Sequence, residues 1–98
     1  MIIVLASGRV PGGRRPEYMQ AVADSGAVRA TRLENGCLNY DVSASANDPD
    51  TIYIVERWEG FPALKEHMMG ENMACLNDVN AKFGVAYQAS LYKAEPMG

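Results

Sequence analysis

The order of strand-like and helix-like stretches along the 98 residues is the feature that most constrains the fold. Residues 2–10 are β-prone and end at the breaker cluster Pro11-Gly12-Gly13. From Pro16 onward, apolar residues recur every three or four positions, which predicts one amphipathic helix of about 17 residues. Asn35-Gly36 is a suitable C-terminal cap for that helix.

Two strands follow the predicted helix. Residues 37–44 alternate with period two, so we expect Leu38, Tyr40 and Val42 on one face. Residues 51–58 are rich in β-branched and aromatic side chains, and the turn residues 47–50 separate the two runs. The pattern predicts a β-hairpin.

The last third of the chain contains two further helices and a strand. Pro62 marks the first turn of one helix, Gly70 interrupts it, and a helix over residues 72–83 ends at Gly84. Alternating side chains over residues 85–93 predict the final strand.

The resulting order, β-α-β-β-α-α-β, predicts an α+β fold over a single domain, residues 1–98. This is the ferredoxin-like split βαβ arrangement, a four-stranded antiparallel sheet with helices on one face. The strands carry apolar or aromatic side chains on both faces, so the bare face needs a cover. We expect a homodimer that packs the two sheets face to face with two-fold symmetry.

Charge and composition exclude several classes of function. The net charge is −3 and the basic residues are scattered, which disfavours nucleic-acid and anionic-membrane partners. The apolar start of the chain is short and lacks a basic region, so we expect a cytoplasmic protein with no membrane segment.

Cofactor and metal sites are also disfavoured. No glycine-rich phosphate-binding motif is present, and the chain has one His and two Cys. We therefore expect no nucleotide cofactor and no zinc site. Cys37 and Cys75 are expected to be free thiols, with a disulfide as the alternative.

The strongest candidate site comes from the hairpin and the helix that follows it. Alternation places Glu56 and Trp58 on one face, beside Ile52 and Ile54. His67 follows in the next helix, so a pocket between sheet and helix could combine the three groups for proton transfer. The alternative is that Glu56 pairs elsewhere, for example at a helix end, and that His67 is a half-exposed helix residue.

The other asparagines, tyrosines and methionines of interest have ordinary structural explanations. We expect the asparagines of the third helix to lie on a solvated face, the tyrosines to serve mainly the dimer interface, and the methionines around Gly70 to pack in the core. A lid over a pocket is the alternative for the methionines. These residues are Asn72, Asn77, Asn80, Tyr40, Tyr53, Tyr87, Tyr92, Met68, Met69 and Met73.

Four segments together resemble the antibiotic biosynthesis monooxygenase domain. They are Asn35-Gly36-Cys37-Leu38-Asn39-Tyr40, Asn47-Asp48-Pro49, Val55-Glu56-Arg57-Trp58-Glu59 and residues 64–67. The resemblance spans the whole chain and implies a dimeric α+β barrel of ferredoxin-like subunits.

Some members of that family oxidise phenols with dioxygen and no cofactor. The resemblance implies His67 as base or hydrogen-bond partner, Trp58 as pocket wall and N–H donor, and Glu56 as the group that orients them. Haem-degrading relatives use an Asn on the first strand and a His on the last helix, both of which are missing here.

The sequence thus predicts a cofactor-independent monooxygenase-like enzyme that acts on a small aromatic or quinol-type substrate. Two alternatives remain. One is a dimeric small-ligand-binding protein without catalysis. The other is an isomerase or lyase for a small sugar or carbonyl compound, for which Arg9, Arg57 and Lys65 would be the available basic groups.

Overall fold

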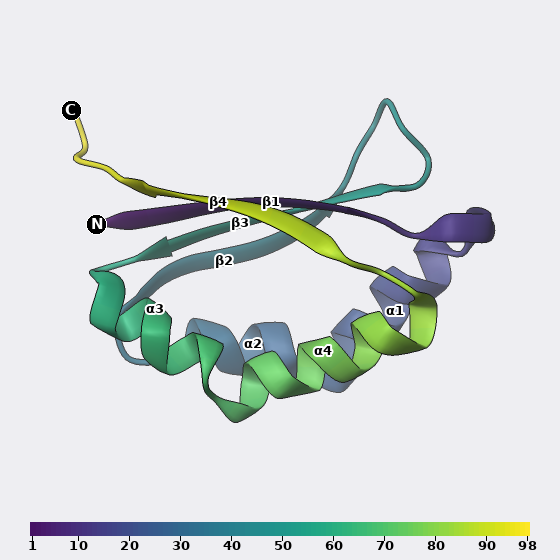
Figure 1. Ribbon diagram of the computed structural model, residues 1–98, viewed down its shortest axis with the longest axis horizontal. Coiled ribbons are helices and arrows are strands. Elements are labelled where there is room, and N and C mark those ends of the chain that lie inside the picture. Colours follow the sequence, from purple (N-terminus) through teal and green to yellow (C-terminus); the bar gives the residue numbers. More distant parts are fainter.

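A computed structural model describes all residues, 1–98, as one sheet covered by a layer of helices (Figure 1). The strands are β1 (Ile2–Arg9), β2 (Cys37–Ala44), β3 (Thr51–Trp58) and β4 (Tyr87–Lys93). They form a four-stranded sheet in the order β2-β3-β1-β4, and every neighbouring pair is antiparallel. The predicted ferredoxin-like topology and the hairpin between β2 and β3 are therefore confirmed.

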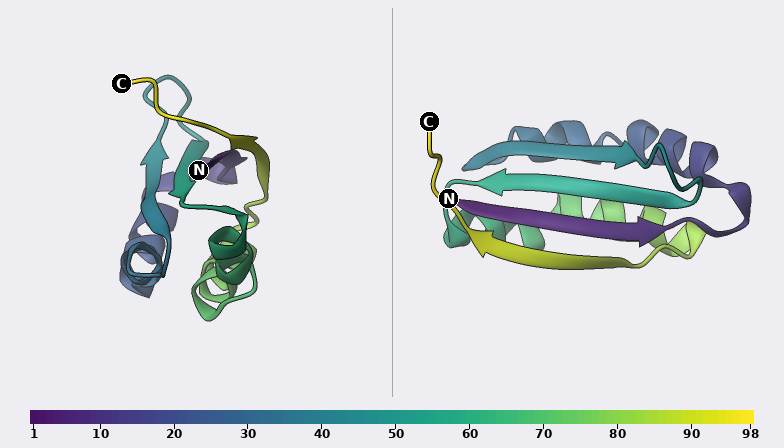
Figure 2. Two further views of the ribbon diagram at one scale, coloured as in Figure 1. Left: turned by 90° about the vertical axis from the view of Figure 1, so that its left-hand side faces the viewer. Right: turned by 90° about the horizontal axis from the view of Figure 1, so that it is seen from above.

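All helices lie on one face of the sheet. They are α1 (Arg15–Ser25), α2 (Ala27–Arg32), α3 (Phe61–Met68) and α4 (Glu71–Phe83), after a 3-10 turn over Pro11–Gly13. Figure 2 shows them in two columns, α1 with α2 and α3 with α4, while the opposite face of the sheet carries no element of the chain. None of the helices combines the length and the apolar character that a membrane crossing requires.

The prediction of one long first helix is wrong. Gly26 adopts φ 71° and ends α1, and α2 starts at the next residue. The Ser25 hydroxyl bridges the break, since it donates to the Val22 carbonyl and accepts from the Ala27 amide. A glycine inside an apolar stripe here marks a left-handed break in the helix.

Two strand details also differ from the expectation. A bulge between Cys37 and Asn39 leaves Leu38 45% exposed, so it does not share the buried face of Tyr40. The last strand starts at Tyr87, because the Val85 amide donates to the Asn80 carbonyl and so belongs to the C-terminal cap of α4.

The core fills the space between the helices and the inner face of the sheet. Its largest fully buried side chains are Trp58, Tyr18, Ile52 and Leu64. Cys37 and Cys75 are free thiols at its margin. Hydrophobic burial of this kind supplies most of the stability of a small domain.

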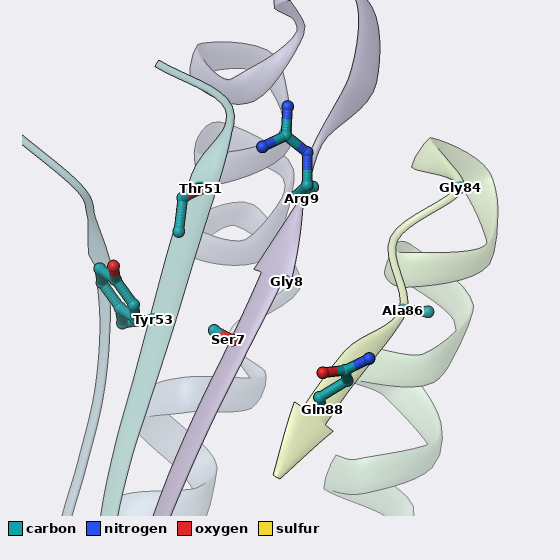
Figure 3. A pocket seen from close by; sticks show the side chains of 8 residues that line it. All are labelled: Ser7, Gly8, Arg9, Thr51, Tyr53, Gly84, Ala86 and Gln88. Carbon is teal, nitrogen blue, oxygen red and sulfur yellow. The ribbon is translucent and has the colours of Figure 1, made fainter. Parts of the chain in front are cut away.

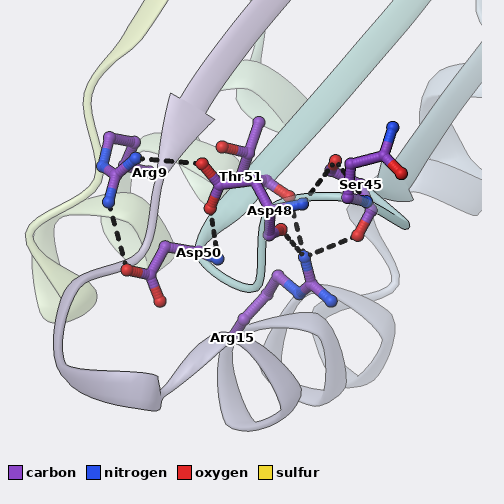
Figure 4. Close-up of polar contacts among 7 residues, drawn as sticks. Arg9, Arg15, Ser45, Asp48, Asp50 and Thr51 are labelled. Carbon is purple, nitrogen blue, oxygen red and sulfur yellow. Dashed lines mark hydrogen bonds and ion pairs between the residues drawn. The ribbon is translucent and has the colours of Figure 1, made fainter.

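The loop between β2 and β3 is held by arginines from other elements (Figure 4). Arg15 donates from Nη1 to the carbonyls of Ser45, Asp48 and Thr51 at 3.0, 2.6 and 3.2 Å. Arg9 forms ion pairs with Asp48 at 3.3 Å and Asp50 at 3.1 Å. The loop is thereby fixed to the start of α1 and the end of β1.

Candidate functional site

Glu56 and Trp58 lie side by side on the inner face of β3, as the alternation predicted. Glu56 is 8% exposed and Trp58 is fully buried. The Trp58 indole donates from Nε1 to Glu56 Oε1 at 2.9 Å. The indole therefore satisfies its own buried N–H and one oxygen of the carboxylate.

Burial raises the pKa of Glu56, because a low-polarity environment penalises the charged carboxylate. The hydrogen bond from Trp58 and the nearby imidazole of His67 partly offset this increase, and the Glu34 carboxylate adds to it. A buried carboxyl with a raised pKa is a candidate for exchanging a proton with a bound ligand.

His67 of α3 joins these two residues. Its ring stacks on the Trp58 indole, with centroids 4.8 Å apart and planes inclined by 30°. The side chain is 1% exposed, so the interpretation of His67 as a half-exposed helix residue is wrong. The structure therefore brings Glu56, Trp58 and His67 together.

The carboxylate that contacts His67 is Glu34, which the sequence analysis did not single out. His67 Nδ1 lies 3.2 and 3.0 Å from the two Glu34 carboxylate oxygens, and Asn72 donates to Glu34 Oε2 at 3.0 Å. Nε2 of His67 is buried without a partner. Glu34 lies in the turn between α2 and β2, and 33 residues separate it from His67, so no local periodicity connects them.

A cavity of about 100 Å³ lies between the sheet and the helices. Its walls are mostly apolar and come from every strand and from α1 and α4: Ala6, Tyr18, Val22, Tyr40, Val42, Ile54, Glu56, Met73, Leu76, Asn80, Tyr87 and Ala89. Glu56 is the only carboxylate among them, and neither Trp58 nor His67 lines the cavity. Of the three predicted site residues, Glu56 is thus the one that faces the space where a ligand would bind.

Three further polar groups in the cavity wall form a hydrogen-bonded set. The Tyr18 hydroxyl donates to Asn80 Oδ1 at 2.6 Å and lies 2.8 Å from the Tyr87 hydroxyl. Gly8 lacks the Cβ that would approach the Tyr87 ring to 3.0 Å, so the ring can lie close to the β1 backbone. Asn80 therefore does not lie on a solvated face as expected, and the same correction applies to Asn72.

The tyrosines and methionines named above fall into two groups, those that line the cavity and those that are exposed. Tyr40 and Tyr87 line the cavity, whereas Tyr53 and Tyr92 are exposed. Met73 also lines the cavity, but Met68 and Met69 are 52% and 78% exposed. The expectation of core packing therefore fails for Met68 and Met69.

Another hollow lies on the opposite face of the sheet (Figure 3). It has a volume of about 580 Å³ and is open, with polar and small residues from β1, β3, the start of β4 and the segment that precedes β4. Ser7, Tyr53 and Gln88 line it, while the Arg9 guanidinium is engaged by Asp48 and Asp50. It contains no buried titratable group, so the inner cavity is the better candidate site.

No group of three or more His, Cys, Asp or Glu side chains is arranged to hold a metal ion. Arg57 donates from Nε to Asn39 Oδ1 on the exposed side of β3, and no Arg or Lys lines the inner cavity. The cavity therefore offers a carboxyl, hydroxyls and an amide, but no cation for a phosphate.

Comparison with solved structures identifies similar chains over almost the full length. A protein from Deinococcus radiodurans assigned as an antibiotic biosynthesis monooxygenase has a TM-score of 0.85 at 24% identity, with 98% of this chain and 94% of that one covered. Another antibiotic biosynthesis monooxygenase has a TM-score of 0.81 at 25% identity, with 98% and 100% covered.

SnoaB, a cofactor-independent oxygenase from Streptomyces nogalater that was solved as a mutant, has a TM-score of 0.78. The alignment covers 98% of this chain and 94% of SnoaB, but at 10% identity it shows a shared fold alone. No curated protein matches the sequence. The sequence model of one family, antibiotic biosynthesis monooxygenase, matches residues 1–74, which is most of the chain and includes Glu34, Glu56, Trp58 and His67. The chain therefore belongs to the antibiotic biosynthesis monooxygenase family.

Proposed function

We propose that this protein oxidises a small, single-ring phenol or hydroquinone with dioxygen and without a cofactor. The observation that carries the proposal is a buried carboxyl with a raised pKa, Glu56, in the wall of an apolar cavity. Membership of a monooxygenase family supports the same class of reaction.

The size of the cavity limits the substrate. Pockets for drug-sized ligands usually have volumes of about 300–1,000 Å³. The inner cavity, at about 100 Å³, is closer to the space needed for one aromatic ring. Its walls combine apolar side chains with a carboxyl and a hydroxyl–amide set, which suits a ring bearing hydroxyl groups.

The residues would act on the proton of the substrate. Glu56 accepts the phenolic proton, and the electron-rich phenolate then reduces dioxygen itself. One oxygen atom forms a bond to the ring and the other leaves as water, so a hydroquinone becomes a hydroxyquinone. Tyr18, Asn80 and Tyr87 are available to hydrogen-bond the second oxygen of the ring, in a site that largely excludes water.

This assignment changes the roles that the family resemblance implied. His67 does not reach the cavity, so we assign the proton-accepting role to Glu56. Trp58 holds the Glu56 carboxylate through its N–H, and the His67 ring stacks on the Trp58 indole and fixes its position.

We further propose that the active form is a homodimer. The uncovered face of the sheet carries the exposed side chains Leu5, Tyr53, Val55 and Tyr92, which a second copy would bury. Val55→Asp should convert a dimer to a monomer in sedimentation analysis, whereas a monomeric wild-type protein would contradict the proposal.

Dioxygen consumption tests the proposed reaction. The rate with methylhydroquinone in buffer containing a chelator and no flavin should exceed the rate of autoxidation without protein. Glu56→Gln should lower that excess by about 10²-fold or more, the contribution typical of a general base. Glu66→Gln, an exposed position on α3, is the matched control and should retain the activity.

Two outcomes would contradict the proposal. One is the absence of an excess rate with folded, dimeric protein over a panel of single-ring hydroquinones. The other is full activity in Glu56→Gln. Binding of such compounds without turnover, seen as shifts in NMR spectra, would instead support a ligand-binding protein.

A further inference from the structure

The turn that contains Glu34 is held tightly against both β3 and α3. The Glu59 amide donates to the Gly36 carbonyl at 2.8 Å, and the Cys37 amide donates to the Glu34 carbonyl at 3.1 Å. Gly36 has φ 81°, and a Cβ at this position would lie 2.5 Å from Ala63 Cβ. The backbone around Glu34 therefore has a defined place beside the first turn of α3.

The carboxylate of Glu34 is equally well defined. Asn72 donates to Oε2 at 3.0 Å, and His67 Nδ1 lies 3.0 Å from the same oxygen. Because an ionised carboxylate only accepts hydrogen bonds, Nδ1 of His67 must carry the proton. The other ring nitrogen, Nε2, is buried and has no partner.

The unpartnered Nε2 also bears on the tautomer of the ring. A proton on Nε2 would be a buried N–H donor without an acceptor, whereas a proton on Nδ1 is accepted by Glu34. The geometry therefore favours the Nδ1–H tautomer over the Nε2–H tautomer.

The contacts continue from His67 to the cavity. The His67 ring stacks on Trp58 at 4.8 Å, and Trp58 donates to Glu56 at 2.9 Å. Glu34, His67, Trp58 and Glu56 thus form an unbroken series of contacts. It runs from a side chain that is 23% exposed to a carboxyl in the cavity wall.

We propose that Glu34 is a positioning residue of this site: it fixes the Nδ1–H tautomer and the orientation of His67, and thereby holds Trp58 and its N–H on Glu56. The role of Glu56 in turnover rests on the proposed function, but the effect of Glu34 on His67 and Trp58 does not. Asn72 contributes a further hydrogen bond to Oε2 of the Glu34 carboxylate, which helps to fix its orientation.

The composition of the chain makes the test direct, because His67 is its single His and Trp58 its single Trp. In ¹⁵N NMR spectra at about pH 8.5, where a free imidazole is neutral, wild-type His67 should show the Nδ1–H tautomer. Glu34→Ala should shift the ring toward the Nε2–H form and move the one indole N–H resonance of Trp58. Glu66→Ala, the matched exposed control on α3, should change neither signal.

A conservative variant separates positioning from damage to the fold. Glu34→Gln retains an oxygen that can accept from Nδ1, so it should keep the Nδ1–H tautomer and most of the wild-type indole shift. Dispersed backbone spectra establish that each variant is folded. An Nε2–H tautomer in the wild type, or an unchanged indole resonance in Glu34→Ala, would overturn the proposal.

Kinetics extend the test to the reaction. Glu34 does not line the cavity, so Glu34→Ala should lower kcat about tenfold or more, as a small misplacement of a reacting group does, and leave KM nearly unchanged. A change in the NMR signals with unaltered kcat would overturn the link between Glu34 and turnover. If the wild-type protein shows no turnover, the proposed function fails, while the NMR spectra still decide the positioning role.

Discussion

The two ends of β3 hold carboxylates in opposite ways. Near Thr51, Asp48 and Asp50 lie at the surface and pair with the Arg9 guanidinium. Near Trp58, Glu56 is buried and receives a single indole N–H. One strand therefore connects a solvated ionic cluster with a largely buried carboxyl.

The pKa values of the two carboxyls move in opposite directions. The Asp50 backbone amide donates to Asp48, and together with Arg9 it lowers the pKa of Asp48. Burial raises the pKa of Glu56. The comparison shows that the surroundings, more than the residue type, decide which carboxyl is available as a proton acceptor.

The largest effect is expected from Trp58→Ala at the buried end. Removal of a fully buried indole should lower the free energy of unfolding by about 3–5 kcal/mol, as measured by urea denaturation. Trp58→Phe keeps a ring but loses the N–H on Glu56, and it should cost less. A loss below about 1 kcal/mol in Trp58→Ala would contradict the packing described here.

The next effect concerns two glycines with positive φ: Gly36 in the turn that contains Glu34, and Gly12 in the 3-10 turn after β1. Gly36→Ala should lose about 2–4 kcal/mol, because it combines a strained backbone with a clash against Ala63. The matched control is Gly12→Ala: it has a similar φ of 74° but nothing within 4 Å of the added Cβ, so it should lose only about 1–2 kcal/mol.

A double variant separates the two causes. Adding Ala63→Gly to Gly36→Ala removes the clash and should recover that part of the loss in urea denaturation. Equal losses at Gly12 and Gly36 would mean that the turn around Glu34 is less tightly packed than its contacts indicate.

At the exposed end, Arg15→Met should cost about 1–2 kcal/mol, because three backbone carbonyls lose a charged donor. Arg9→Met removes only surface ion pairs and should cost less than about 1 kcal/mol. High salt should weaken the effect at Arg9 more than that at Arg15. The reverse order in thermal denaturation would show that ion pairs dominate this loop.

The smallest effects are differences in how stability depends on pH. The raised pKa of Glu56 gives a contribution that is present below its ordinary value of 4.5 and is lost as pH rises through the folded-state pKa. Asp48 behaves oppositely: its contribution is present above 3.8 and is lost as pH falls through its lowered pKa.

Urea denaturation over a pH series checks both signs. At alkaline pH, Glu56→Gln should have a higher free energy of unfolding than the wild type. Asp48→Asn should be less stable than the wild type at neutral pH, and this difference should disappear at acidic pH. A Glu56→Gln difference that does not grow with pH would show that this carboxyl is not penalised by burial.

Sequence periodicity was sufficient for the layers of the fold and for part of the site. Alternation along β3 placed Glu56 and Trp58 on the inner face, and the short connection to α3 placed His67 beside them. These are local relations, for which the period of a strand and the length of a loop are adequate guides.

Contacts between distant segments were not predictable in the same way. Glu34 meets His67, and Asn80 meets Tyr18, across 33 and 62 residues, and only the packing of two helix columns brings them together. The helix break at Gly26 was missed because a glycine in a stripe of alanines keeps the apolar spacing intact while its backbone turns left-handed. The cavity follows from the shapes of side chains from six elements, which no pattern of spacing records.

The bulge at Leu38 has a consequence for how molecules of this protein meet. β2 is an outer strand of the sheet, and its free edge would otherwise be a regular template for a foreign strand. The extra residue interrupts the spacing of the backbone donors and acceptors along that edge, and the exposed Asp41 further along β2 adds charge. Lateral growth of the sheet into aggregates is thereby discouraged on the β2 side.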